Sequence, residues 1–240
     1  MNKIITVRSR GKIRTINTLH RGKGTEVAHE FLDKVSRGFV KYSSNYMKLV
    51  EESPFAFREK QLNSILAPAL AEFSKAFLME FPINRKNKKL DYDSHGWVDY
   101  WAYYKSIDFY LELKHSYASL GGKITNVTLR RWESANCQAK DCIHSLPCLE
   151  GSRGFMSLSI QIIPIYETVK LNKEASSIND VERLINIQNI FHEKLEPRVN
   201  WSFLWIVHEN LANKSYDLRE KNKKYYPAVL IVANVSTLKK

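Results

Sequence analysis

The sequence lacks three features that would place it in a simple class of protein. No stretch approaches the roughly 18 consecutive apolar residues that a membrane-spanning helix requires, so we expect no membrane partner. The first eight residues, MNKIITVR, contain no apolar core of a secretory signal. The three cysteines, Cys137, Cys142 and Cys148, are odd in number and match no zinc-site spacing. We therefore expect a cytoplasmic protein with reduced thiols.

The chain also lacks internal repeats and low-complexity linkers. Its 240 residues are 44% hydrophobic and 26% charged, which is ordinary globular composition and enough length to bury a core. Residues 1–24 are basic, and their apolar positions keep no steady period. We expect a basic N-terminal arm over residues 1–24, in part a strand, followed by a single domain over residues 25–240.

Acidic residues are scarce relative to basic ones, and the net charge is +12. Such an excess favours association with polyanions, of which nucleic acid is the commonest. Seven basic residues precede the first acid, Glu26. Those that we expect to contact nucleic-acid phosphates are Arg8, Arg10, Lys12 and Arg14. The alternative is a basic protein whose surface charge serves solubility alone.

Hydrophobic periodicity predicts alternating helices and strands. Apolar stripes at helical spacing and a capping box at Ser177–Asp180 predict four helices, over residues 25–50, 56–80, 127–144 and 177–197. Alternating or continuous apolar runs predict strands over residues 81–83, 97–104, 108–116, 156–162, 201–207 and 228–235. Helices placed before and between strands can cover both faces of a sheet. The expected fold is α/β, a three-layer α/β/α sandwich around a mixed central sheet.

The stretch from Gly96 to Ser116 is the centre of the functional hypothesis. Trp97 to Tyr104 is rich in aromatic and β-branched residues, and Asp108 to Lys114 alternates polar and apolar positions. A short polar segment between them predicts a β-hairpin. Pairing the two halves brings Asp99 close to Glu112 and Lys114.

Two carboxylates and an amine at one place on a sheet suit magnesium-dependent phosphodiester cleavage. Glu112 and Lys114 alone would be explained by an ion pair on the wet face of an edge strand, which contributes roughly 0–1 kcal/mol. Asp99 stands among aromatic residues, and a lone buried carboxylate costs several kcal/mol unless it is paired or metal-bound. The metal site explains all three residues.

Asp99 followed by Glu112-Leu113-Lys114 on the neighbouring strand resembles the PD-(D/E)XK superfamily, the restriction-endonuclease-like nucleases. Val98 stands where the motif has its proline. The resemblance extends to the order of elements: leading helix, hairpin, crossover helix, further strand. It implies that Asp99, Glu112 and the backbone carbonyl of Leu113 ligate Mg²⁺, with Mn²⁺ as a substitute. It also implies that Lys114 orients or deprotonates the attacking water.

Other residues are assigned more loosely. Glu59 lies at the edge of the apolar face of the expected helix 56–80, and the resemblance offers it as the carboxylate that some members add from this helix; the alternative is a surface acid. Ser116 continues the strand face of Lys114 and could touch a phosphate. Arg130 and Arg131 could contact backbone phosphates, or lie on a solvated helix face. His115 should point away from Lys114 into the core.

The resulting hypothesis is a magnesium-dependent nuclease that cleaves DNA, in restriction, defence or repair. Cleavage of both strands often needs two active sites, so a homodimer is consistent with this activity. A catalytically inactive nucleic-acid-binding or assembly module on the same fold, an RNA nuclease, and a basic scaffold protein stay open as alternatives.

Overall fold

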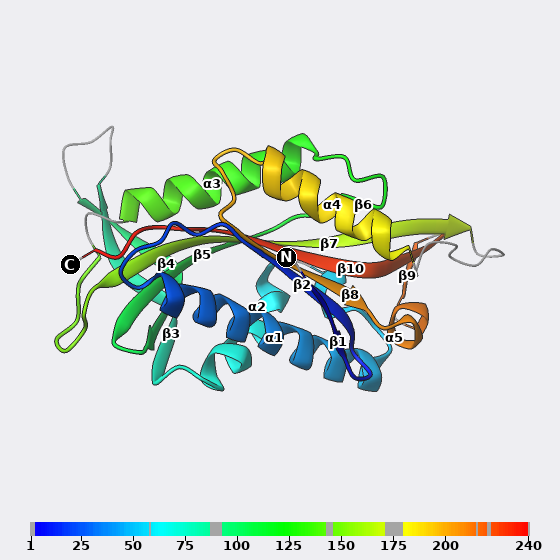
Figure 1. The fold of residues 1–240 in the computed structure, drawn as a ribbon, viewed down its shortest axis with the longest axis horizontal. Helices are drawn as coiled ribbons and strands as arrows, with labels where there is room; N and C mark the ends of the chain where they lie inside the picture. Colours follow the sequence, from blue (N-terminus) through cyan, green and yellow to red (C-terminus); the bar gives the residue numbers. More distant parts are fainter. Residues whose placement is uncertain are drawn as a thin grey trace.

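The computed structural model describes residues 3–57, 59–86, 93–142, 146–170, 180–214, 216–219 and 222–239. In this part of the chain, ten strands form one mixed sheet, and helices lie on both of its faces (Figure 1). The predicted α/β class is therefore confirmed.

Strands and helices are interspersed along the chain. The strands are β1 (Ile4–Val7), β2 (Gly11–Asn17), β3 (Ala76–Lys86), β4 (Asp93–Tyr104), β5 (Ile107–His115), β6 (Ala118–Ser119), β7 (Phe155–Lys170), β8 (Trp201–Val207), β9 (Tyr216–Arg219) and β10 (Asn222–Val235). The helices are α1 (Thr25–Val50), α2 (Glu59–Ala71), α3 (Asn126–Cys142), α4 (Val181–Lys194) and α5 (Glu209–Lys214), with a 3-10 turn at Pro54–Ala56.

Across the sheet the strand order is β1-β2-β8-β10-β7-β5-β4-β3, with β6 beside β7 and β9 beside β10. β5 pairs with β7 in parallel, and the pairings of β7 with β10 and of β5 with β4 are antiparallel. A parallel pair needs a crossover connection. α3 makes this crossover between β5 and β7, and it packs over both strands.

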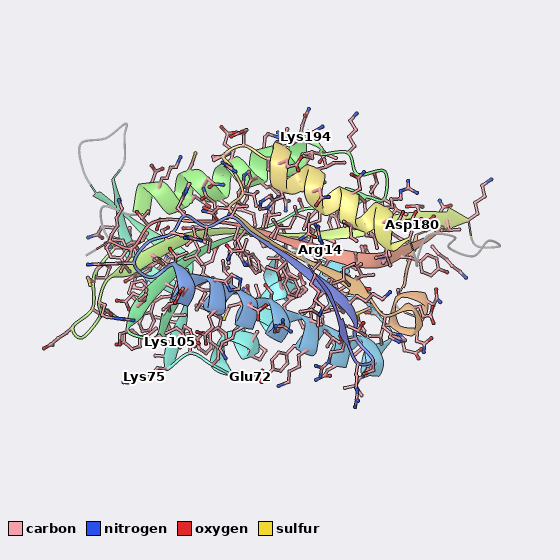
Figure 2. All side chains as sticks on the ribbon, in the orientation of Figure 1. Arg14, Glu72, Lys75, Lys105, Asp180 and Lys194 are labelled. Atoms are coloured by element: carbon pink, nitrogen blue, oxygen red, sulfur yellow. The ribbon has the colours of Figure 1, made fainter. Side chains whose placement is uncertain are left out.

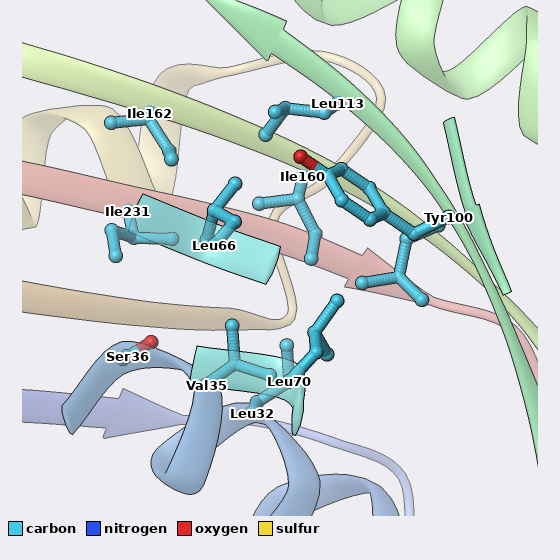
Figure 3. A pocket seen from close by; sticks show the side chains of 11 residues that line it. Leu32, Val35, Ser36, Leu66, Leu70, Tyr100, Leu113, Ile160, Ile162 and Ile231 are labelled. Carbon is cyan, nitrogen blue, oxygen red and sulfur yellow. The ribbon is translucent and has the colours of Figure 1, made fainter. Parts of the chain in front are cut away.

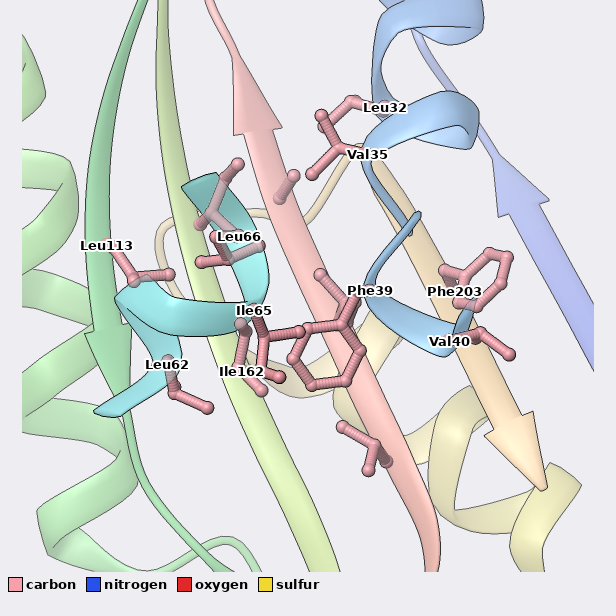
Figure 4. Packing of buried hydrophobic residues seen from close by; sticks show 14 of the residues in the cluster. Leu32, Val35, Phe39, Val40, Leu62, Ile65, Leu66, Leu113, Ile162 and Phe203 are labelled. Carbon is pink, nitrogen blue, oxygen red and sulfur yellow. The ribbon is translucent and has the colours of Figure 1, made fainter. Parts of the chain in front are cut away.

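Each face of the sheet buries its own core. On one face, α1 and α2 contribute Val35, Phe39 and Leu66 to a large cluster against the central strands (Figure 4). On the other face, Trp132 from α3 and Phe191 from α4 belong to a second cluster. A sheet that is covered on both sides has central strands without polar alternation. The continuous apolar runs of β8 and β10 are explained in this way.

Residues 4–17, which we expected in a basic arm, form two strands of the sheet. β2 pairs with β8 along its whole length, from Gly11 opposite Val207 to Asn17 opposite Trp201. Ile13 and Ile16 are both buried although their spacing places them on opposite faces of the strand. Because β2 buries apolar residues on both of its faces, these residues show no period of two, and the strand signal in the sequence is weak.

The expected helix over residues 56–80 is wrong at its C-terminal end. α2 ends at Ala71, and residues from Ala76 onward pair with β4 as strand β3. Ser74 closes the helix by donating from both its backbone N–H and its hydroxyl to the carbonyl of Leu70. The apolar residues of this segment are compatible with helix or strand, and the pairing partner decides between them. Pro68 lies within α2 and does not split it.

α4 begins after Asp180, the last residue of the expected capping box. The carboxylate of Asp180 accepts a hydrogen bond from the backbone N–H of Arg183 at 3.0 Å, and Figure 2 shows Asp180 at the start of this helix. An oxygen acceptor at this position satisfies one of the free N–H groups of the first turn. Ser177, the residue that we expected to begin the capping box, lies outside the described residues.

Among the described helices none is long and apolar enough to cross a membrane.

A small apolar cavity of about 20 Å³ lies between α1, α2 and the sheet (Figure 3). Its lining is aliphatic apart from Ser36 and Tyr100, and the Tyr100 hydroxyl donates to Asn63. A buried water needs two to four polar partners, so this cavity is a dry packing void. The functional site lies elsewhere.

α1 and α2 approach each other closely at Gly38. A Cβ at this position would lie 2.6 Å from the Cβ of Ala69 and 3.1 Å from its Cα. The absence of a side chain at Gly38 therefore sets the distance between the helices. Since α2 begins at Glu59, this contact also sets the position of a candidate site residue.

Gly38→Ala should lower the free energy of unfolding by about 2 kcal/mol because the new methyl group overpacks the helix contact. Ala69→Gly alone should cost about 1 kcal/mol through helix propensity. Chemical denaturation of both single variants and the double variant forms a thermodynamic cycle. The double variant should lose less than the sum of the single losses; strict additivity would contradict the proposed contact.

Candidate functional site

The predicted hairpin is present, and its turn fixes the register. Lys105 and Ser106 form a two-residue connection in which both residues have positive φ, 47° and 61°. Tyr104 pairs with Ile107, and the ladder continues to Tyr100 opposite Leu111. Two residues with positive φ are typical of the turn that matches strand twist in short hairpins. The next residues of β4 and β5 in this register are Asp99 and Glu112.

β4 leaves β5 at this point. Pairing between the two strands ends at Tyr100 and Leu111, whereas β4 stays paired with β3 as far as Asp93. The β3–β4 ladder is interrupted opposite Asp99, where Glu80 has a positive φ of 52°. Beyond Leu111, the edge of β5 that faced β4 therefore lacks its backbone partner.

Carboxylates take the place of the missing strand. The Oδ2 atom of Asp99 accepts from the backbone N–H of Leu113 at 2.6 Å. Two residues further along, the Oε2 atom of Glu59 accepts from the backbone N–H of His115 at 2.8 Å. Alternate residues of a strand point their N–H groups to the same side. Asp99 and Glu59 therefore occupy successive positions along one edge of β5, although they come from different elements.

Lys114 completes this group. Its Nζ atom donates to the carbonyl oxygen of Leu113 at 3.0 Å and lies 3.9 Å from Oδ2 of Asp99. The side chain of Lys114 is 17% exposed and that of Asp99 is 39% exposed. A screened pair of this kind adds little stability. The structure thus brings together three of the residues that the sequence predicts, Asp99, Lys114 and Glu59.

Glu112 is the buried carboxylate of the site, at 2% exposure. The sequence predicted that Asp99 is the buried acid, and this prediction is wrong because its side chain is 39% exposed. The alternative that placed Glu112 on the wet face of an edge strand is also wrong, because its side chain is buried. Glu112 pairs with Ser159 of β7, whose hydroxyl donates to the Ala135 carbonyl of α3. Glu112 therefore shares the face of the sheet that α3 covers.

An open pocket of about 690 Å³ adjoins Lys114 and Glu59. It lies between the start of α2, the end of β5 and α3. Its lining combines aromatic, cationic, amide and carboxylate side chains with one alanine: Ala56, Phe57, Glu59, Gln61, Lys114, His115, Tyr117 and Arg131. The guanidinium of Arg131 donates to the His115 carbonyl and so joins α3 to the end of β5.

His115 is buried, as expected, and it is one of the residues that line the pocket. Burial, followed by the nearby charges of Arg131 and Lys224, lowers the pKa of His115 from 6.5 to about 4, while a hydrogen bond to the backbone of Phe55 opposes the shift. The imidazole is therefore neutral at neutral pH. Its Nε2 atom has no hydrogen-bond partner among the described residues.

Ser116 does not have the position that the sequence predicts. It is buried, and its hydroxyl accepts a hydrogen bond from Nε2 of Gln161 at 2.9 Å. Gln161 also donates to the Thr128 carbonyl of α3. A serine held inside this network cannot reach a phosphate at the surface, so its predicted role is wrong.

The basic residues separate into two groups. Arg8, Arg10, Lys12 and Arg14 lie at β1 and β2, and strands β8, β10 and β7 stand between β2 and β5. Arg14 donates to Gln188 and Asn189 of α4 at 2.8 and 2.9 Å (Figure 2). These four residues are therefore not brought to the candidate site.

α3 contributes one of its two predicted basic residues to the site. Arg131 lines the pocket beside Lys114, whereas Nε of Arg130 donates to the Asn126 carbonyl of its own helix. The helix places adjacent residues about 100° apart, so only one of the pair can face the end of β5.

The donor set is compatible with a magnesium ion. Mg²⁺ prefers oxygen ligands and is commonly held by one or two carboxylates while it keeps several waters. Asp99, Glu112 and the Leu113 carbonyl supply such oxygens, and the Lys114 ammonium already contacts the Leu113 carbonyl and approaches Asp99. Within the described residues, no cluster of three or more His, Cys, Asp or Glu side chains could hold a metal ion. A site with two carboxylates and a carbonyl does not require such a cluster.

The comparisons with known proteins add nothing to this geometry. The chain matches no family model, no curated protein and no solved structure.

Asp108 is a buried acid that the sequence argument left unassigned. Its carboxylate accepts from Nε1 of Trp101 at 3.0 Å, from the backbone N–H of Leu149 at 3.3 Å and from the hydroxyl of Ser152 at 2.5 Å. These donors account for its burial. Asp108 holds the 149–152 loop to the hairpin, and it is a structural acid on the same strand as Glu112.

Asp108→Asn should lower the free energy of unfolding by about 1–3 kcal/mol because the amide presents a donor to groups that are themselves donors. Urea denaturation monitored by tryptophan fluorescence measures the loss. Asp33→Asn, which breaks only the ion pair between Asp33 and Arg37 on α1, is the control and should cost about 0.3–0.5 kcal/mol. Equal stability of the two variants would contradict the structural role of Asp108.

His115 should make stability depend on pH. Its pKa is about 4 in the folded chain and 6.5 without burial, so the unfolded chain binds the proton first as the pH falls. Stability should therefore fall by about 2 kcal/mol from this residue between pH 7.5 and pH 5. Urea titrations at both pH values, on the wild type and on His115→Gln, isolate the contribution. The variant should show the shallower dependence, and identical dependences would refute it.

Proposed function

We propose that this chain is a metal-dependent nuclease that hydrolyses phosphodiester bonds in DNA, on a three-layer α/β/α fold of the restriction-endonuclease type. The observation that supports the proposal most directly is the arrangement around Lys114. Its ammonium lies 3.0 Å from the Leu113 carbonyl oxygen and 3.9 Å from the Asp99 carboxylate, beside an open pocket.

This arrangement favours a divalent cation at the unpaired edge of β5. The oxygens of Asp99 and Leu113 converge on a cationic group, and Glu112 belongs to the same strand. Asp99, Glu112 and the Leu113 carbonyl would hold the ion. When bound, Mg²⁺ supplies Lewis-acid stabilisation of the phosphate and lowers the pKa of water that it coordinates.

The protein's own residues then have distinct tasks. Asp99 is held in place by its hydrogen bond from Leu113, so its carboxylate is oriented before any ligand binds. Lys114 is mostly buried yet lines the pocket, where its ammonium can orient the attacking water and offset negative charge on the phosphate. Glu59, bonded to the next N–H along β5, can accept a proton or orient a second water.

Arg131 supports nucleic acid as the substrate. It places a second cation in the same pocket as Lys114, and the whole chain has a net charge of +12. Cationic side chains that converge on one pocket favour a polyanion over a small neutral substrate. The basic residues of β1 and β2 lie toward the opposite edge of the sheet and do not line this pocket.

The first test is nicking of a supercoiled plasmid in Mg²⁺. Asp99→Asn and Lys114→Ala should each lower the rate about 100-fold or more, because each removes a charged group that acts on the reacting phosphate. Asp33→Asn and Lys34→Ala change the same residue types on α1, away from the pocket, and should keep the wild-type rate. Equal nicking by wild type and Lys114→Ala would refute the mechanism.

The alternatives give different outcomes. An inactive nucleic-acid-binding module would bind oligonucleotides without nicking by any variant, and calorimetry would detect no Mn²⁺ binding that depends on Asp99. An RNA nuclease would cleave an RNA oligonucleotide and spare DNA of the same sequence. A basic scaffold protein would neither cleave nor lose affinity for Mn²⁺ in Asp99→Asn.

A further inference from the structure

Exposed aromatic rings are rare on this protein and lie close to the candidate site. Among the aromatic side chains in the described ranges, Phe57 and Trp97 are the two most exposed, at 44% and 57%. Phe57 precedes Glu59 by two residues, and Trp97 precedes Asp99 by two residues. The large aromatic residues elsewhere, such as Trp132, Trp201 and Trp205, are buried.

Phe57 is exposed on a fixed backbone. The hydroxyl of Tyr117 is bonded to the carbonyls of Ala56 and Phe57, at 2.9 and 2.7 Å. Phe57 nevertheless lines the open pocket and is 44% exposed instead of packing into the core. An exposed ring on an anchored segment leaves apolar surface in water, and a ligand that covers this ring would recover its burial energy.

The pocket also offers polar groups that suit the edge of a nucleobase. Gln61 supplies an amide, and Arg131 supplies a cation. Every nucleobase carries acceptor atoms on its pairing edge, and these atoms could accept hydrogen bonds from Gln61 and Arg131 once the base is unpaired.

Size and position agree with this occupant. A volume of about 690 Å³ falls within the range of small-molecule sites, so it can admit a nucleotide. Lys114 lies in the wall of the pocket, so a nucleotide seated there has its phosphate next to the residues that would cleave it. Base pairs in a duplex keep their faces stacked and their edges paired, so a duplex cannot use these rings.

We infer that the site binds single-stranded or locally unpaired nucleic acid, with one base seated in the pocket against Phe57 and a neighbouring base stacked on Trp97. This inference deepens the proposed nuclease function and rests on it for the identity of the bond that is cleaved. The stacking itself can be measured without catalysis. Stacking on an aromatic ring tolerates any base, so little sequence preference is expected.

The test compares the affinity for a fluorescent 20-nucleotide single strand with that for the matching duplex, by anisotropy in EDTA. Phe57→Ala and Trp97→Ala should each weaken single-strand binding about 10-fold, and duplex binding should change less than about 2-fold. Phe57→Tyr and Trp97→Phe keep a ring and should restore most of the affinity. Leu49→Ala removes an exposed apolar side chain from α1 and should bind both substrates as the wild type does.

Two results would overturn the inference. One is wild-type single-strand affinity in both alanine variants; the other is an equal loss for single strand and duplex. Asp99→Asn separates this inference from the nuclease proposal, because it should abolish nicking and keep ring-dependent binding in EDTA. Nicking that is independent of Phe57 and Trp97 would support the nuclease proposal and contradict the binding inference. Ring-dependent binding without nicking by the wild type would support the binding inference and contradict the nuclease proposal.

Discussion

The separation of β4 from β5 after Tyr100 and Leu111 is the constraint from which the site follows. Backbone N–H groups that lose a strand partner must find other acceptors, because leaving them unpaired is costly. Here the acceptors are the carboxylates of Asp99 and Glu59, which bond the N–H groups of Leu113 and His115. The separation of the two strands therefore also fixes the positions of Asp99 and Glu59. It also frees the Leu113 carbonyl for Lys114.

The rest of the fold keeps this edge in position. α2 carries Glu59, and the close contact between Gly38 and Ala69 sets how near α2 stands to α1. α3 crosses from β5 to β7, and it delivers Arg131 to the end of β5. Asp108 ties the loop after α3 to the hairpin. The pocket beside Lys114 lies between α2, α3 and the end of β5, so it depends on contacts between elements that are distant in sequence.

The acids on the hairpin show why burial matters more than residue type. Asp108 and Glu112 occupy the same strand and are both buried, whereas Asp99 is partly exposed. Asp108 is surrounded by donors from three residues and needs no ligand. Asp99 has a single backbone donor and a nearby ammonium, so its oxygens remain accessible to a cation. A sequence argument that treats acids alike cannot separate these roles.

Several features could be predicted from the sequence because they depend on local chemistry. The alternation in β5, the short polar turn and the apolar runs of β8 and β10 are encoded by neighbouring residues, and they were sufficient to predict the hairpin and the proximity of Asp99 and Lys114. Contacts between distant segments decided the rest. Pairing with β8 turned the expected arm into strands, pairing with β4 ended α2 at Ala71, and the hydrogen bond from Gln161 withdrew Ser116 from the surface. These outcomes depend on which backbone groups and side chains meet, and only the tertiary structure determines that.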